Sequence, residues 1–295
     1  MNNKLKNLNL GEFTLFLSHF FREVKLLEPL SSLAHTNLSH RVELDKKDYV
    51  LKIYSGSDRR RIIQDILLQN FFNDQGLPCQ RIIALGDNHL LECKGFYCSL
   101  SEFIYGEPMG IIDLKDAFQI FDVLKRLYEI GENYTGDIAN KSVITPPAED
   151  GPYIAEFEEM LNRYKSICGS FGRMETLIHG DFHFGHALRS QEGKIFLLDF
   201  ESVRMGDSLE DLASFIFYSK CTGRNQMLSP RELFDYFIGE NNAQSRDVKT
   251  LKYYVRKVSL MYGLGSIWEF NRGFIDQKEL GKRLKTINRA DNLEI

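Results

Sequence analysis

The 295-residue sequence has few of the features that mark several common classes of protein. It holds five cysteines, and none has the paired C-x-x-C spacing of a zinc site, so we expect reduced thiols rather than a disulfide framework. No apolar run approaches the roughly 20 residues of a membrane-spanning helix. The net charge is −4, and no basic cluster follows a helix face, which argues against nucleic acid. We therefore expect a cytoplasmic protein that binds neither membranes nor nucleic acid.

The most informative stretch runs from residue 177 to residue 212, LIHGDFHFGHALRSQEGKIFLLDFESVRMGDSLEDL. Asp181 lies in the loop HGDFHFGH, and Asp199 ends the apolar run IFLLDF. The segments HALRS and KIFLLDF are separated by a short Gly-containing gap, which is typical of a β-hairpin. A hairpin brings its outer ends together, so Asp181 and Asp199 should meet at one end of a ribbon. Two such carboxylates suit either a divalent cation or a general base beside a metal ligand.

This stretch resembles the catalytic core of the aminoglycoside phosphotransferase and choline kinase superfamily, whose members share the protein-kinase fold. The family pattern is H-G-D-x-H-x-x-N, then a hairpin, then D-F-[DEG], then G-D-x-x-x-D-L. The chain matches it at His179, Gly180, Asp181, His183, Asp199, Phe200, Glu201, Gly206, Asp207, Asp211 and Leu212. The resemblance implies an α+β, bilobal fold. Residues 1–105 would form a small β-rich nucleotide-binding lobe, and residues 106–295 a larger, mainly helical catalytic and substrate-binding lobe, with ATP in the cleft.

The resemblance also implies an ATP-dependent kinase that transfers the γ-phosphate to a hydroxyl of a small polar substrate. An aminoglycoside, an amino alcohol such as choline, a sugar and a homoserine-like amino acid all stay open as acceptors. Asp181 would be the catalytic residue that accepts or orients the hydroxyl proton, and Asp199 would hold Mg²⁺. His179 and His183 are expected to brace the loop by hydrogen bonds. Asp207 and Asp211 would hold the loop and the start of the following helix, and for both we favour simple capping of that helix.

Three segments of the first third match nucleotide-binding positions of the family. Residues 35–54 alternate in polarity around a polar turn and predict a hairpin whose Lys52 falls on the ATP lysine. The alternative for Lys52 is an edge-strand lysine that faces solvent. Residues 58–75 predict a helix on which Asp65 matches the carboxylate that pairs with this lysine; a solvated Asp65 is the alternative. The backbone of Glu102, Phe103 and Ile104 resembles the hinge that binds adenine.

His186 departs from the family pattern, because it replaces an Asn that is a magnesium ligand. Magnesium prefers oxygen and suits imidazole poorly. His186 could ligate a softer ion such as Mn²⁺, or water could take the place of the amide, which we favour because both aspartates are present. Catalysis could instead be impaired, leaving a nucleotide-binding pseudokinase. The run H-x-D-x-H-x-x-H would also suit a metal-dependent hydrolase, although no second His/Asp cluster follows it.

Helical periodicity extends over much of the remaining chain. We expect helices over residues 10–26, 113–134 and 153–172, and again over 207–222, 229–240, 245–270 and 275–290. The last helices carry aromatic rings beside a carboxylate, which could hold a cationic amine but more often form core. These residues are Tyr253, Tyr254, Tyr262, Trp268, Glu269 and Phe270.

Overall fold

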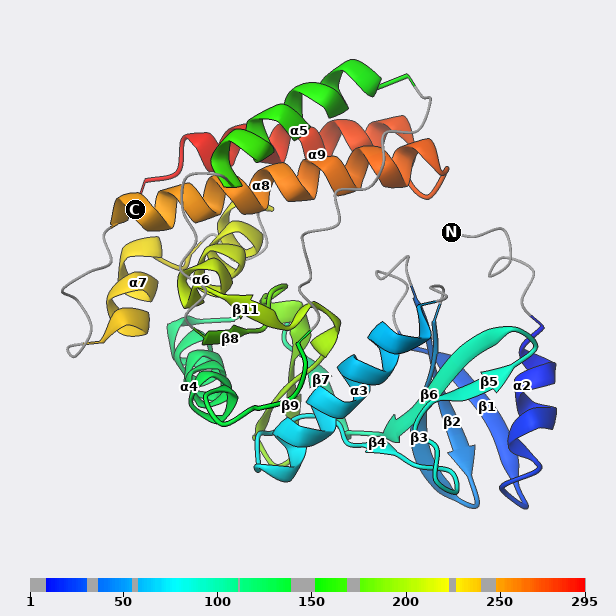
Figure 1. The fold of residues 1–295 in the computed structure, drawn as a ribbon. Coiled ribbons are helices and arrows are strands. Elements are labelled where there is room, and N and C mark those ends of the chain that lie inside the picture. The colour runs from blue at the N-terminus through cyan, green and yellow to red at the C-terminus, as the bar shows by residue number, and fades with distance from the viewer. Residues whose placement is uncertain are drawn as a thin grey trace. The chain divides into compact units, whose positions relative to one another are not determined.

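The computed structural model divides the chain into two compact units, Met1–Gly106 (unit 1) and Glu107–Ile295 (unit 2). It describes residues 9–30, 37–54, 58–110, 112–138, 152–168, 176–222, 227–239 and 248–294. Each unit is described by itself (Figure 1). The predicted ends of several elements, at residues 35–36, 169–172, 240 and 245–247, lie outside the described residues.

Unit 1 is built on an antiparallel sheet in the order β1-β2-β3-β6-β4, with β5 paired to β6. Two helices, α2 (Leu10–Leu17) and α3 (Arg59–Asp74), accompany the sheet. Phe13 and Leu17 of α2 are fully buried in one core with the sheet residues Val42, Leu51 and Leu100. The strands are β1 (Val24–Pro29), β2 (Asn37–Leu44), β3 (Lys47–Tyr54), β4 (Ile82–Ile83), β5 (Leu91–Cys93) and β6 (Phe96–Glu102).

The predicted hairpin is confirmed in β2 and β3, which pair from Leu44 opposite Lys47 outward. Its two turn residues, Asp45 and Lys46, both have positive φ (49° and 68°), as tight hairpin turns require. The helix predicted over residues 10–26 is wrong beyond residue 17. The side chains of Ser18 and His19 bond to backbone carbonyls of the last helical turn, and this competition ends the helix before β1.

Unit 2 is mainly helical, with short strands that carry the acidic motif. Its strands are β7 (Gly106–Pro108, which starts at the last residue of unit 1), β8 (Thr176–Ile178), β9 (Ala187–Ser190), β10 (Ile195–Leu197) and β11 (Arg204–Gly206). The helices are α4 (Leu114–Gly131), α5 (Ile154–Cys168), α6 (Ser208–Ile216), α7 (Pro230–Ile238), α8 (Val248–Asn271) and α9 (Gln277–Asp291). Two 3₁₀ turns, Phe184–His186 and Phe200–Ser202, and a π-helix, Phe217–Cys221, complete the unit.

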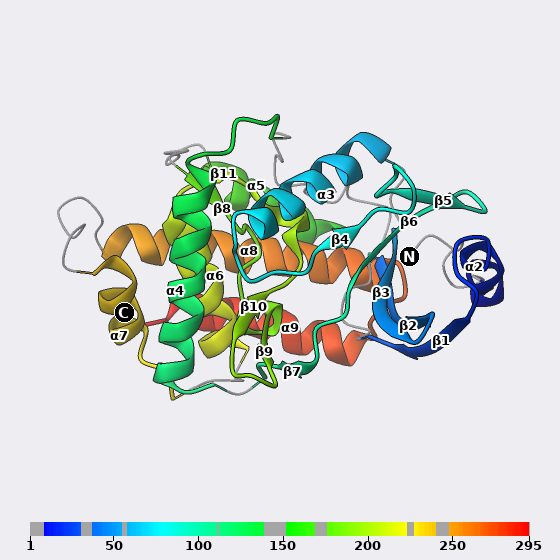
Figure 2. The ribbon, with the colours of Figure 1, turned by 90° about the horizontal axis from the view of Figure 1, so that it is seen from below.

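Helix α8 is the helix on which several others in unit 2 pack. Helices α5 and α9 lie along α8 (Figure 1) and share an apolar core that includes Phe157, Leu264 and Leu280. Helix α4 lies beside the β9–β10 ribbon, as Figure 2 shows from below. The ribbon is therefore supported on a helix rather than exposed as an isolated hairpin, which is marginal in water.

Two expectations drawn from composition can be compared with the structure. Among the described residues, Cys79, Cys93, Cys98 and Cys221 are buried free thiols, so the expectation of unpaired cysteines holds there. Burial raises the pKa of the Cys79 and Cys98 thiols to about 12, which leaves them unreactive. Within the described ranges, none of the helices combines the length and apolarity needed to cross a membrane.

Candidate active site

The β9–β10 ribbon places the two predicted acidic residues at its open end. Ile195 pairs with Arg189 and Leu197 with Ala187, so the two strands run antiparallel from the turn to the open end of the ribbon. His186 connects the two ends: its Nδ1 lies 2.8 Å from the Asp181 carbonyl oxygen, and its Nε2 lies 3.7 Å from Asp199 Oδ2. The predicted meeting of the two aspartates is thus confirmed.

Asp199 has an unusual backbone conformation. Its φ is 61° and its ψ is 72°, a left-handed geometry that non-glycine residues adopt rarely. It precedes the 3₁₀ turn Phe200–Ser202, but its carboxylate makes no capping bond to that turn. Such strain is kept only where the surrounding structure holds it, and it is frequent at ligand sites.

His179 and His183 brace the loop, as predicted. His179 is fully buried, and burial lowers its pKa to about 4, so its ring is neutral. Its Nε2 donates to the carbonyl oxygen of Leu198 at 2.9 Å, and the N–H of Leu198 donates to the His186 carbonyl at 2.8 Å. His183 Nδ1 accepts from the N–H of Gly185 at 3.0 Å. The two bonds to Leu198, the residue before Asp199, hold that residue from both sides.

Asp211 holds the catalytic loop, a role that the expected helix cap does not describe. It is completely buried and accepts from the backbone N–H groups of His179 and Gly180, each at 2.8 Å, and from the Tyr128 hydroxyl at 3.0 Å. Burial raises its pKa to about 6, against the effect of these donors. Asp207 does cap α6, through the N–H of Leu209 at 2.9 Å. The favoured capping role is therefore confirmed for Asp207 and wrong for Asp211, for which the alternative of holding the loop is confirmed.

Gly180 is required by the crowded backbone next to Asp181. Its φ is 82°, and a Cβ there would lie 2.1 Å from Arg204 Nη1 and 2.2 Å from the Ser202 carbonyl oxygen. The Arg204 guanidinium is itself held by Glu210 at 2.6 Å, and Lys257 contacts the same carboxylate at 2.9 Å. This close packing holds the positively charged guanidinium of Arg204 beside the loop.

The Asp181 carboxyl has a raised pKa. Burial is the main cause, and the nearby negative charge of Asp199 adds to it. The positive charge of Arg204 acts in the opposite direction. A carboxylate with a raised pKa is a stronger proton acceptor than a free one, which suits a general base.

Tyr218 is a neighbour of the site that the sequence analysis missed. It lies in the π-helix Phe217–Cys221, with its ring centroid 4.5 Å from that of His183 and 5.9 Å from that of Tyr262. Burial, and then the charge of Asp181, raise its pKa well above the usual range, so the phenol stays protonated. A π-helix shifts the helical register by one residue, and the apolar periodicity of the sequence does not reveal that shift.

The predicted nucleotide-binding residues lie in unit 1. Lys52 is on β3, between β2 and β6, so the edge-strand alternative is wrong. Its side chain is half-buried, and its Nζ lies 5.8 Å from the centre of the Tyr54 ring. Asp65 is half-buried on α3, which speaks against full solvation.

The predicted hinge is partly occupied by bonds within unit 1. The N–H of Glu102 donates to the Arg81 carbonyl at 3.0 Å, and its own carbonyl accepts from Gln80 Nε2 at 3.3 Å. Phe103 is covered by the guanidinium of Arg41, 4.6 Å from the ring centre. The main-chain N–H and carbonyl of Glu102 are therefore both hydrogen-bonded within unit 1.

The aromatic residues of the last helices do not form a free cage for an amine. Tyr254 is 2% exposed, and its hydroxyl donates to Asp207 Oδ2 at 3.2 Å. Glu269 pairs with Arg283 at 2.8 Å. Arg272 already covers the Trp268 ring at 4.6 Å. The core interpretation is therefore supported for Tyr254, and the carboxylate of the supposed cage is neutralised.

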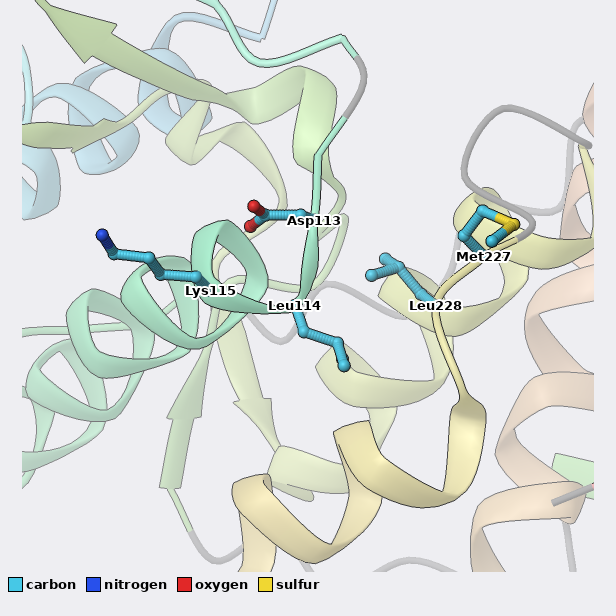
Figure 3. A pocket seen from close by; sticks show the side chains of 5 residues that line it. All are labelled: Asp113, Leu114, Lys115, Met227 and Leu228. Carbon is cyan, nitrogen blue, oxygen red and sulfur yellow. The ribbon is translucent and has the colours of Figure 1, made fainter.

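A hollow of about 340 Å³ lies elsewhere in unit 2, between the start of α4 and the segment before α7. Figure 3 shows the side chains of Leu114 and Leu228 facing it, whereas Lys115 extends away. The Asp113 carboxylate is engaged in capping α4. None of the predicted site residues lines this hollow.

Comparison with known proteins supports the same interpretation. Residues 141–242, which include the whole ribbon, match the model of the phosphotransferase enzyme family. This match supports the resemblance seen in the sequence and the predicted enzyme class. No sequence among the curated proteins matches the chain.

Solved structures show the fold. Amicoumacin kinase hAmiN, solved with AMP-PNP, Ca²⁺ and Ami, has a TM-score of 0.74 at 12% identity, covering 99% of this chain and 96% of that one. Spectinomycin phosphotransferase APH(9)-Ia has a TM-score of 0.65 at 15% identity, with coverages of 95% and 97%. Choline kinase LicA from Streptococcus pneumoniae has a TM-score of 0.63 at 14% identity, with coverages of 95% and 98%. The predicted kinase-like α+β fold is confirmed.

Proposed function

We propose that this chain, which has the fold and the catalytic segment of the aminoglycoside phosphotransferase and choline kinase superfamily, is an ATP-dependent small-molecule kinase. It would transfer the γ-phosphate to a hydroxyl group of a small polar acceptor. The observation that carries the proposal is the placement of Asp181 and Asp199 at one end of the ribbon, connected through His186. Phosphoryl transfer depends on positioning and charge stabilisation, and both carboxylates are held for these purposes.

Asp181 is the proposed general base. It takes the proton of the acceptor hydroxyl while the oxygen bonds to the γ-phosphorus, and the bond to the β-phosphate oxygen breaks to release ADP. Its raised pKa favours proton acceptance, and the positive charge of Arg204 acts against the rise. Asp211 positions the loop through the N–H groups of His179 and Gly180.

Asp199 is the proposed ligand of the divalent cation. A carboxylate oxygen is the ligand that Mg²⁺ and Mn²⁺ accept most readily, and no capping bond to the following turn competes for it. The cation supplies charge neutralisation of the phosphate oxygens when bound. Lys52 would contact the α- and β-phosphates, Asp65 would orient Lys52, and the main chain of the predicted hinge would contact adenine.

The proposed acceptor is a hydroxyl-bearing small molecule, such as an amino alcohol, an aminoglycoside or a sugar. The names of the similar kinases support this range, because they include amicoumacin, spectinomycin and choline. The Glu269–Arg283 pair favours recognition through hydroxyl hydrogen bonds over an aromatic cage for a cation. Tyr218, protonated and beside His183, is the proposed donor to an acceptor oxygen.

A metal-dependent hydrolase fits the geometry less well. That alternative needs His179 as a ligand, but His179 is buried and its Nε2 is bound to the Leu198 carbonyl. Among the described residues, the one group of three or more candidate ligand atoms that all lie within 4.8 Å of one another comes from Asp181, His183 and His186. A single such group lacks the several ligand segments of a dinuclear hydrolase.

The test is phosphate transfer from [γ-³²P]ATP to a panel of aminoglycosides, amino alcohols and sugars, with Mg²⁺ or Mn²⁺. The proposal predicts at least one acceptor that is phosphorylated in a protein-dependent and metal-dependent way. ATP binding without transfer to any acceptor would instead indicate the nucleotide-binding module. Failure to bind ATP with either metal would overturn the kinase proposal.

A further inference from the structure

We infer that the cation site of this chain is a mixed nitrogen–oxygen site, formed by His186 Nε2 and the Asp199 carboxylate, which prefers Mn²⁺ to Mg²⁺. The inference rests on the proposed kinase function and names the metal of the same site. The inference follows from the hydrogen bonds of His179, His183 and His186, which determine where each ring carries its proton and which way the ring faces.

The tautomer of His186 is set by its backbone contact. Its Nδ1 lies 2.8 Å from the Asp181 carbonyl oxygen, which can only accept, so Nδ1 carries the proton. In the neutral ring, Nε2 then presents its lone pair at 3.7 Å from Asp199 Oδ2. A metal-bound histidine usually donates the N–H of its other ring nitrogen to such an acceptor, as His186 Nδ1 does to the Asp181 carbonyl.

The other two histidines are oriented differently. His183 Nδ1 accepts from the N–H of Gly185, so a neutral His183 carries its proton on Nε2 and has no lone pair to offer there. Its ring lies 3.8 Å from that of His186 and supports the plane of the ligand. His179 uses Nε2 to bind Leu198 inside the core. Of the three, His186 alone is set to act as a ligand.

The spacing of the two ligand atoms fits a shared first-row ion. Two atoms that each lie about 2.1 Å from one metal are roughly 3.0–3.4 Å apart, so the observed 3.7 Å requires only a small side-chain movement. Mn²⁺ prefers oxygen ligands but, as a first-row transition ion, also binds mixed nitrogen–oxygen sites, although more weakly than the later ions of the row. Magnesium favours oxygen alone.

The experiment is pulsed electron paramagnetic resonance of Mn²⁺ bound with AMP-PNP to protein labelled with ¹⁵N-histidine. The label separates protein imidazole from the ¹⁴N atoms of adenine. We expect ¹⁵N coupling to Mn²⁺ in the wild-type protein, its loss in His186→Asn, and its retention in the matched variant His183→Asn. The wild-type spectrum decides the main point even if a variant fails to fold.

A second readout is the ratio of the Mn²⁺ and Mg²⁺ dissociation constants in the presence of AMP-PNP. His186→Asn should reduce the preference for Mn²⁺ by about tenfold, the lower end of the effect of losing a metal-supporting histidine contact. Absence of ¹⁵N coupling in the wild type, its survival in His186→Asn, or an unchanged ratio would overturn the inference. Phosphate transfer that persists in those cases would leave the kinase proposal intact, whereas absence of ATP binding would overturn both.

Discussion

The ribbon segment, residues 176–211, and the helix pair α8–α9 both carry the acidic and aromatic residues that attracted attention in the sequence. In the ribbon, Asp181 and Asp199 meet around His186, and the surrounding bonds support them. On α8, Glu269 is neutralised by Arg283, and Tyr254 is bonded within the core. Whether an acidic or aromatic side chain can bind a ligand thus depends on its contacts with neighbouring residues and not on its residue type alone.

The largest effect that would test this comparison is expected at Asp181. The variant Asp181→Asn cannot accept the hydroxyl proton, so phosphate transfer should fall by about 10²–10⁴-fold while ATP binding stays within about twofold. Steady-state transfer and calorimetry measure the two quantities. Asp235→Asn is the matched control, because it alters an exposed carboxylate paired with Arg231. Transfer by Asp181→Asn at the control rate would refute the role of Asp181.

Asp211 should dominate the stability of the loop. The variant Asp211→Ala leaves two buried N–H groups and a tyrosine hydroxyl without their acceptor, so we expect a loss of about 3 kcal/mol in the free energy of unfolding. Asp207→Ala, which removes a cap of the same helix and the acceptor of the Tyr254 hydroxyl, should cost less, about 1–2 kcal/mol. Urea unfolding compares the variants. An equal cost for both would mean that Asp211 is an ordinary cap.

The pH dependence of the free energy of unfolding should reveal that the buried His179 ring is neutral in the folded protein. Its pKa is about 4 in the fold and about 6.5 when unfolded, so the unfolded chain binds more protons between these values. Stability from this group is therefore complete above pH 6.5 and is lost as the pH falls toward 4. The difference in the free energy of unfolding between wild type and His179→Gln should shrink by up to ~1.4 kcal/mol for each unit by which the pH falls below 6.5. Urea unfolding from pH 7 to 5 measures this difference, and a constant difference would contradict a neutral His179.

The smallest effect is expected at Glu269. Because Arg283 already neutralises this carboxylate, Glu269→Gln should change the KM of any acceptor by less than about twofold, with a loss of stability of about 1 kcal/mol or less. Acceptor kinetics with the best amine and the best sugar substrate measure the change. A rise of tenfold or more in KM for the amine alone would restore the aromatic-cage interpretation.

The sequence predicted the ribbon well because its signals are local. The Gly-containing turn, the alternation of the strands and the H-x-D spacing specify the hairpin and the meeting of Asp181 and Asp199. The role of Asp211 depends on donors 31 and 32 residues away, and Tyr218 depends on a π-helix, so neither has a local signal. The long predicted N-terminal helix failed because Ser18 and His19 bond to the backbone that would have continued it.

The most direct test is calorimetry of ATP binding, with and without Mg²⁺ or Mn²⁺, to wild type and Asp199→Ala. If Asp199 holds the cation that neutralises the phosphates, the metal should strengthen ATP binding to the wild-type protein, and this gain should disappear in the variant. A metal-dependent gain of equal size in both proteins would contradict the assignment of Asp199 and the kinase site built on it.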